Sequence, residues 1–182
     1  MSTPYVLSTP FKLGGYAASA ILVALGIAMV VLGFVGRGDV HDRLSQEQIV
    51  GTPDSSIPNE PVNTGSEAKA FADVMRKHTL EATGGKTYAE MPRAVFKSTG
   101  EPVPEQQVDQ ALASGRAIDN PEREIWITST ALSTALNTSY FAESVATFTI
   151  VVGVALLLIG IGLLVLTRGL VSRDAAGVRG SP

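Results

Sequence analysis

The chain has 182 residues and a net charge of −3, and only 17% of its residues are charged, against about a quarter in ordinary soluble domains. It contains no cysteine, which excludes thiolate zinc sites, iron–sulfur clusters, disulfide bonds and cysteine nucleophiles. The negative net charge argues against a nucleic-acid partner.

The first charge-free stretch covers residues 16–35. Its ~20 residues, at about 1.5 Å of rise each, match a hydrocarbon core of roughly 30 Å. Lys12 precedes the stretch, Arg37 follows it, and only Ser19 within it is strongly polar. We therefore predict a transmembrane helix over residues 16–36. A cleaved signal peptide is the alternative, but its apolar core would be shorter and a small-residue cleavage site would follow.

The residues directly after this stretch carry the first candidates for partner contact. Residues 41–50 are expected to continue the first helix or to form a short helix of their own, which a glycine and several prolines then end. Asp42, Arg43 and Glu47 lie in this segment. Arg43 and Glu47 have the i, i+4 spacing of an ion pair, and the three charges are equally suited to docking against another charged surface.

A well-defined helix is expected next. Thr64 and Glu67 have the spacing of a capping box, and two consecutive glycines at residues 84–85 end the helix. Three- and four-residue steps place a set of mostly apolar side chains on one face, with Phe71 and Met75 as candidate docking residues. The set comprises Ala68, Phe71, Met75, Thr79 and Ala82.

Shorter helices are predicted in the middle of the chain. Thr87 and Glu90 repeat the capping spacing, and Pro104 suits the first position of a helix that ends before Gly115. Because no alternating strand pattern of useful length occurs, we expect this part of the chain to be all-α.

The last helix is expected to start at Asn120-Pro121-Glu122, which combines a cap residue, a proline in the first turn and an acid. It runs without proline or glycine into a second charge-free stretch, residues 145–166, which Glu143 and Arg168 bound. This predicts a second transmembrane helix over residues 144–167.

Small residues recur in both stretches and are candidates for helix packing in lipid. Ala20, Ala24 and Ala28 are spaced four apart, while Gly153 and Gly160 lie seven apart. They are expected to pack the two spans together or this subunit against another, although an alanine-rich composition accounts for them equally well. Neither stretch holds an Asp, Glu, Lys, Arg or His residue, which argues against an ion pathway or a proton relay.

Basic residues near the spans predict the orientation. The tails, residues 1–15 and 168–182, carry four basic residues and one acidic residue, whereas residues 37–143 carry 10 basic and 16 acidic residues. Basic tails stay in the cytoplasm, so residues 37–143 are expected outside the cell membrane. The predicted fold class is an all-α membrane protein in which two transmembrane helices flank a helical extracytoplasmic segment.

Two segments resemble a group of two-span membrane proteins common in actinobacteria. Residues 40–49, with a proline soon after, are similar to an Asp-x-Leu-x-x-Gln-x-Ile pattern that follows the first span in that group, with Glu47 at the glutamine position. Residues 76–91 carry the second similarity. The resemblance implies two spans in a bacterial envelope, and it implies no activity and no site residues.

The sequence shows no catalytic, cofactor or metal constellation. His41 and His78 are the only histidines and lie far apart, so a structural role is favoured over metal binding. Residues 84–87 read Gly-Gly-Lys-Thr, but Leu80 stands where a phosphate loop needs its first glycine. We expect no enzymatic activity, no cofactor and no metal.

The leading functional hypothesis is a structural or accessory subunit of a cell-envelope membrane assembly, whose outer segment contacts a protein partner or a second copy. The alternative is an extracytoplasmic ligand-binding or sensing module anchored by two spans. The sequence does not identify a small-molecule ligand.

Overall fold

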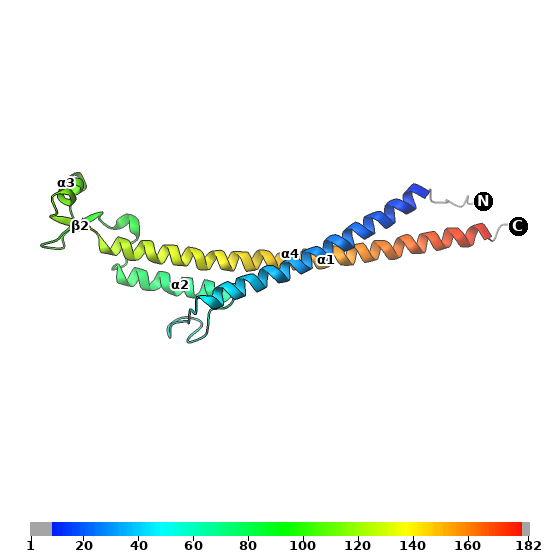
Figure 1. Ribbon diagram of the computed structural model, residues 1–182, viewed down its shortest axis with the longest axis horizontal. Helices are drawn as coiled ribbons and strands as arrows, with labels where there is room; N and C mark the ends of the chain where they lie inside the picture. The colour runs from blue at the N-terminus through cyan, green and yellow to red at the C-terminus, as the bar shows by residue number, and fades with distance from the viewer. Residues whose placement is uncertain (1–8, 180–182) are drawn as a thin grey trace. The chain divides into compact units, whose positions relative to one another are not determined.

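The computed structural model describes the backbone of residues 9–179 and the side chains of residues 12–169. The outer parts of both predicted tails, including the side chains of Arg173 and Arg179, lie outside the described residues. The described chain is mostly helical and divides into two compact units (Figure 1). Unit 1 comprises Met1–Asp39 and Glu143–Pro182, and unit 2 is Val40–Ala142.

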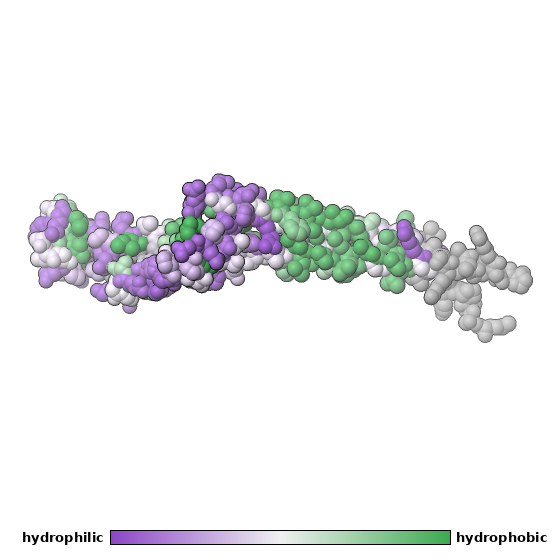
Figure 2. Space-filling view, turned by 90° about the horizontal axis from the view of Figure 1, so that it is seen from below, coloured by the Kyte–Doolittle hydropathy of each residue, from purple (hydrophilic) through white to green (hydrophobic). Residues whose placement is uncertain are grey.

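Two long helices, α1 (Thr9–Gln46) and α4 (Pro121–Arg179), contribute residues to both units. Each is long and apolar enough to cross a membrane, and only 17% and 11% of their most apolar windows are buried. The core helix of a soluble protein would be mostly buried. The low burial of both helices therefore does not fit the interpretation that they are soluble core helices. Figure 2 shows the continuous apolar surface that the two helices present in unit 1.

Within unit 1 the helices run antiparallel and meet through small residues (Figure 1). A Cβ atom added to Gly26 would lie 2.7 Å from the carbonyl oxygen of Gly153 and 2.9 Å from the amide nitrogen of Leu157. The backbones therefore approach as closely as glycine alone permits. The buried contact positions recur every seven residues, and they are Ser19, Gly26 and Gly33 on α1 with Ala146, Gly153, Gly160 and Thr167 on α4.

The alanine stripe proposed for packing of the two spans does not lie in this contact. Ala20, Ala24 and Ala28 are exposed, whereas Gly153 and Gly160 face α1. A four-residue step drifts around a straight helix, but a seven-residue step keeps returning to the side that faces a gently supercoiled neighbour. The positions at which α1 and α4 contact each other therefore repeat every seven residues.

Polar groups in unit 1 are satisfied locally. The hydroxyls of Ser19 and Thr167 donate to the carbonyl oxygens of Gly15 and Leu163, each four residues earlier in the helix, at 2.7 and 2.8 Å. These bonds lower the cost of placing a hydroxyl in an apolar contact. Where the two apolar segments meet their charged ends, Arg37 pairs with Glu143 at 3.1 Å across the two helices.

Replacing Gly26 by alanine is expected to weaken the α1–α4 contact. The added methyl group meets backbone atoms, and overpacking of this kind costs about 1–3 kcal/mol, which exceeds the gain of up to about 1 kcal/mol in helix propensity. Gly162→Ala is the matched control, because a Cβ there meets nothing within 4 Å. Unfolding in mixed detergent micelles should show Gly26→Ala less stable and Gly162→Ala unchanged or more stable; equal stabilities would contradict the packing.

The first part of unit 2 joins the end of α1, helix α2 (Gly65–Ala82) and α4 around a small apolar cluster. Leu44, Ala72 and Leu136 are buried in it, one from each helix. The predicted capping box at Thr64 and Glu67 is confirmed. The predicted helical stop is confirmed as well, since α2 ends at Ala82 and two glycines with positive φ follow.

One boundary and one face differ from the sequence predictions. Helix α1 ends at Gln46 rather than near residue 50, and Gln48 adopts a φ of 52° that stops it. On α2, Ala68 and Thr79 are buried as expected, but Ala72 and Val74 are buried too and Ala82 is exposed. Small alanine side chains let α2 approach its neighbours closely, so the buried face is broader than the large apolar residues indicate.

The second part of unit 2 is a small mixed α/β substructure around Ala94, Val103, Val108, Ala111 and Ala117. The sequence analysis predicted no strand here, although the described chain as a whole is mostly helical, as predicted. Two three-residue strands pair antiparallel, with Ala94 opposite Asp119 and Phe96 opposite Ala117; strands this short cannot display an alternating pattern. The elements are η1 (Tyr88–Glu90), β1 (Ala94–Phe96), η2 (Glu105–Gln107), α3 (Val108–Ala113) and β2 (Ala117–Asp119).

Asn120 links this substructure to α4 and caps the helix as predicted. Its Oδ1 atom accepts from the amide of Glu122 at 3.0 Å, and its Nδ2 atom donates to the carbonyl of Pro92 at 3.0 Å. The side chain is only 3% exposed. One buried amide therefore starts α4 and anchors the chain that precedes β1.

Candidate functional site: a polar groove between α2 and α4

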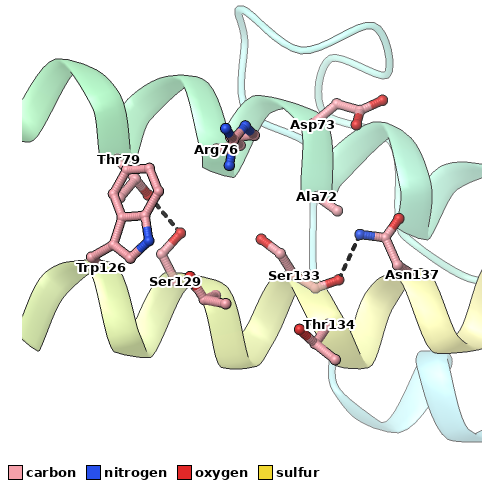
Figure 3. Close-up of a pocket in the computed structure, with 10 residues that line it drawn as sticks. Ala72, Asp73, Arg76, Thr79, Trp126, Ser129, Ser133, Thr134 and Asn137 are labelled. Carbon is pink, nitrogen blue, oxygen red and sulfur yellow. Dashed lines mark hydrogen bonds between the residues drawn. The ribbon is translucent and has the colours of Figure 1, made fainter. Parts of the chain in front are cut away.

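Helices α2 and α4 lie side by side in unit 2 and are joined by a buried hydroxyl pair (Figure 3). The hydroxyls of Thr79 and Ser129 are hydrogen bonded to each other, and the two residues are 6% and 8% exposed. Buried hydroxyls need such partners. This bond fixes the separation of the two helices at one point and leaves a groove beside it.

The groove has a volume of about 170 Å³. Its α4 wall extends over three turns of helix from Trp126 to Asn137, and its α2 wall includes Ala72 and Arg76. Apart from Ala72 and Trp126, every lining side chain is polar or charged. A groove of this character suits a small, hydrogen-bonding ligand better than an apolar one.

Arg76 and Trp126 form the most distinctive pair in the groove (Figure 3). The guanidinium carbon of Arg76 lies 5.6 Å from the centre of the Trp126 ring, within the range of a cation–π contact. The side chain of Arg76 is exposed, so its guanidinium N–H groups remain available for hydrogen bonds. Trp126 is the single tryptophan of the chain.

The acid in the lining is already paired. Asp73 accepts from Lys69 Nζ at 2.9 Å, and this hydrogen bond, followed by the charge of Asp73, raises the pKa of Lys69. Arg76 has no ion pair within the described part of the chain. Of the two charged residues in the lining, Arg76 is therefore the one without an ion-pair partner among the described residues, and Asp73 lies one helical turn before it on α2.

A second groove in unit 2 shows the opposite balance. There Arg123 stacks on Tyr88 at 3.9 Å, but the lining also contains Asp119 and Glu124. Arg93, in the same lining, pairs with Asp109 at 3.1 Å. The positive and negative charges that line this groove are equal in number. A charged ligand is therefore less favoured here than in the groove between α2 and α4.

The docking residues predicted near the end of α1 lie on the surface, and their contact with a partner stays a prediction. Asp42, Arg43 and Glu47 are all exposed, and the structure describes no ion pair between Arg43 and Glu47. Phe71 and Met75 are half-buried and pack against the apolar cluster of unit 2. Because these two side chains pack against the apolar cluster, only part of their surface is exposed to an external partner.

Both histidines hold the loop between α1 and α2. Asp54 accepts from Lys77 Nζ and from His78 Nε2, each at 2.9 Å, and these bonds, Lys77 first, hold the pKa of Asp54 far below its usual value. At the other end of the loop, His41 Nδ1 lies 3.1 Å from the carbonyl oxygen of Asn63. Among the described residues no three His, Asp or Glu side chains gather as metal ligands would.

Sequence reasoning missed the groove because its two walls come from distant segments. Arg76 and Trp126 are fifty positions apart, and neither lies in a recognisable motif. The available signals were the single tryptophan and the run of serine and threonine that follows it. Comparisons with known proteins do not supply a function either, since no family model, curated protein or solved structure matches the chain.

The cap at the start of α2 gives a pH-dependent prediction. Oε2 of Glu67 accepts from the amides of Asn63 and Thr64, each at 2.8 Å. Burial raises the pKa of Glu67, but the hydrogen bonds from these backbone amides lower it by a larger amount. The pKa of Glu67 therefore lies below its ordinary value of 4.5. Because the folded-state pKa is depressed, the carboxylate stabilises unit 2 above about pH 4.5, and this contribution is lost as the pH falls.

Glu67→Ala is therefore expected to lower the free energy of unfolding of unit 2 by about 0.5–2 kcal/mol at pH 7, with a smaller difference at pH 3. Hydrogen exchange of the α2 amides in detergent-solubilised protein measures the free energy of unfolding at both pH values. Glu81→Ala, near the other end of α2, is the control. An equal loss at both pH values would show that the charge of Glu67 does not act in the cap.

Proposed function

We propose that this protein is a two-span protein of a bacterial plasma membrane, with both termini in the cytoplasm and unit 2 outside. In this arrangement the parts of α1 and α4 that belong to unit 1 cross the bilayer. The close backbone contact between Gly26 and Gly153 supports retention of the first helix as a partner of the second, rather than its removal as a signal peptide. The basic character of the short tails supports the orientation.

Introduced cysteines test the orientation, because the chain has none of its own. Ser66→Cys places an exposed thiol on α2 of unit 2, and Leu13→Cys places one before the first span, where the leucine is 71% exposed. A membrane-impermeant maleimide should label only Ser66→Cys in intact cells and both variants after lysis. Labelling of Leu13→Cys alone in intact cells would reverse the proposed orientation.

We propose that unit 2 acts as a structural or accessory subunit by contacting a partner protein, without catalysis. The observation that carries this proposal is an exposed apolar ridge on the unit 2 part of α4. Ile125 and Leu132 are 46% and 39% exposed, and Thr128 and Ala135 lie at the intervening steps and are exposed too. Apolar positions at three- and four-residue steps form the seam by which helices pair.

Purification of the tagged protein from its native membrane in mild detergent tests this role. We expect a stoichiometric companion, and we expect Leu132→Lys to reduce its recovery at least tenfold by placing a charge in the ridge. Val50→Lys is the control, since Val50 is 52% exposed and lies in the loop between α1 and α2. Recovery of the wild-type protein alone and monomeric would overturn the accessory role.

A second role, recognition of a small ligand by unit 2, is favoured by the groove between α2 and α4. The groove and the ridge involve different faces of α4, because Ser129 and Ser133 line the groove whereas Thr128 and Leu132 are exposed on the ridge. The two roles can therefore be tested separately.

A further inference from the structure

The α2–α4 groove contains a cation, Arg76, that forms no ion pair within the described residues. Arg76 is held over Trp126, and the neighbouring Asp73 is paired with Lys69. Arginine recognises carboxylates through two parallel hydrogen bonds, which the guanidinium of Arg76 can form from its place near the Trp126 ring. A ligand with a carboxylate at this position would complete the charge balance of the groove.

Hydroxyl groups along the α4 wall are also available for a ligand. Thr138 and Ser139, outside the groove, donate to carbonyl oxygens four residues earlier, as serine and threonine often do within helices. Thr130, Ser133 and Thr134 line the groove, and no hydrogen bond of their side chains occurs within the described residues. Asn137 donates through Nδ2 to the carbonyl of Ser133 at 2.9 Å, which leaves its Oδ1 atom able to accept.

The composition of the groove restricts the ligand further. A phosphate dianion is disfavoured, because Arg76 is the only cation among the lining residues and Asp73 stands beside it. A long-chain fatty acid is disfavoured as well, because Ala72 and Trp126 are the only apolar residues among those that line the groove. The volume of about 170 Å³ is below the several hundred Å³ of sites for drug-sized ligands, so one sugar-sized unit fits the available space.

We propose that the groove binds a small hydroxylated carboxylic acid of the uronic-acid type. Arg76 takes the carboxylate through its guanidinium N–H groups, and Thr130, Ser133 and Asn137 exchange hydrogen bonds with the hydroxyls of the ring. This assignment deepens the ligand-recognition role of unit 2 and rests on it. It is independent of the contact with a protein partner.

The single tryptophan provides the test. D-glucuronate is titrated into the full-length protein in detergent at constant ionic strength, with D-glucose and acetate as probes that lack the carboxylate or the hydroxyls. We expect a saturable change in Trp126 emission with glucuronate and affinities at least tenfold weaker for the other two. No saturable response to glucuronate, or an equal response to glucose or acetate, overturns the proposal.

Variants assign the response to the groove. Arg76→Gln should lower glucuronate affinity at least tenfold and Ser133→Ala severalfold, while Arg123→Gln, which removes the other stacked arginine, should leave it unchanged. Saturation-transfer NMR on the glucuronate protons supplies a readout that does not depend on tryptophan emission, and circular dichroism checks that each variant is folded. Unchanged binding by folded Arg76→Gln protein overturns the assignment.

A thermal-stability screen separates failure of this ligand class from failure of the broader role. If glucuronate has no effect but another small ligand or an acidic tetraglutamate peptide raises the melting temperature in an Arg76-dependent way, the groove is a binding site and the uronic-acid assignment is wrong. If no ligand shifts the melting temperature, both the assignment and the ligand-recognition role are overturned.

Discussion

The contact between the glycine backbones of α1 and α4 is the constraint on which unit 1 depends. The described side chains of its apolar stretches offer no ion pair and only locally bonded hydroxyls, so shape complementarity must hold the helices together. In lipid, association between helices comes largely from such close packing, because lipid tails compete for apolar contacts. The seven-residue recurrence of small residues provides a continuous flat surface for it.

Unit 2 is held together by different means. Its apolar clusters are built mainly from alanine, valine and leucine, and small clusters of this kind contribute limited burial. Polar side-chain contacts supplement them. The Glu67 and Asn120 caps bind backbone amides, and the carboxylate of Asp54 binds the side chains of Lys77 and His78. Each fixes the end of a helix or a loop, and together they hold α2 and α4 beside the groove.

Local signals in the sequence predicted the local structure well. The starts of α2 and α4 are confirmed at Gly65 and Pro121, because a capping side chain acts on amides only two or three residues away. Features that depend on tertiary pairing were predicted poorly. The alanines of α1 offered for helix packing lie outside its contact with α4. The strands β1 and β2 were not predicted, and nothing in the sequence indicated that Arg76 and Trp126 lie close together.

The hydroxyl groups of α4 carry a consequence for the proposed placement in a bilayer. Thr138, Ser139, Thr147 and Thr149 all return their hydrogen bond to the carbonyl four residues earlier. A side chain bonded in this way is tolerated in water and loses little on entering hydrocarbon. Between the charged Glu143 and Thr149 the boundary between lipid and water therefore need not fall at one residue of α4. Bilayers that differ in thickness by a turn of helix would accommodate the same protein with only a small penalty for mismatch.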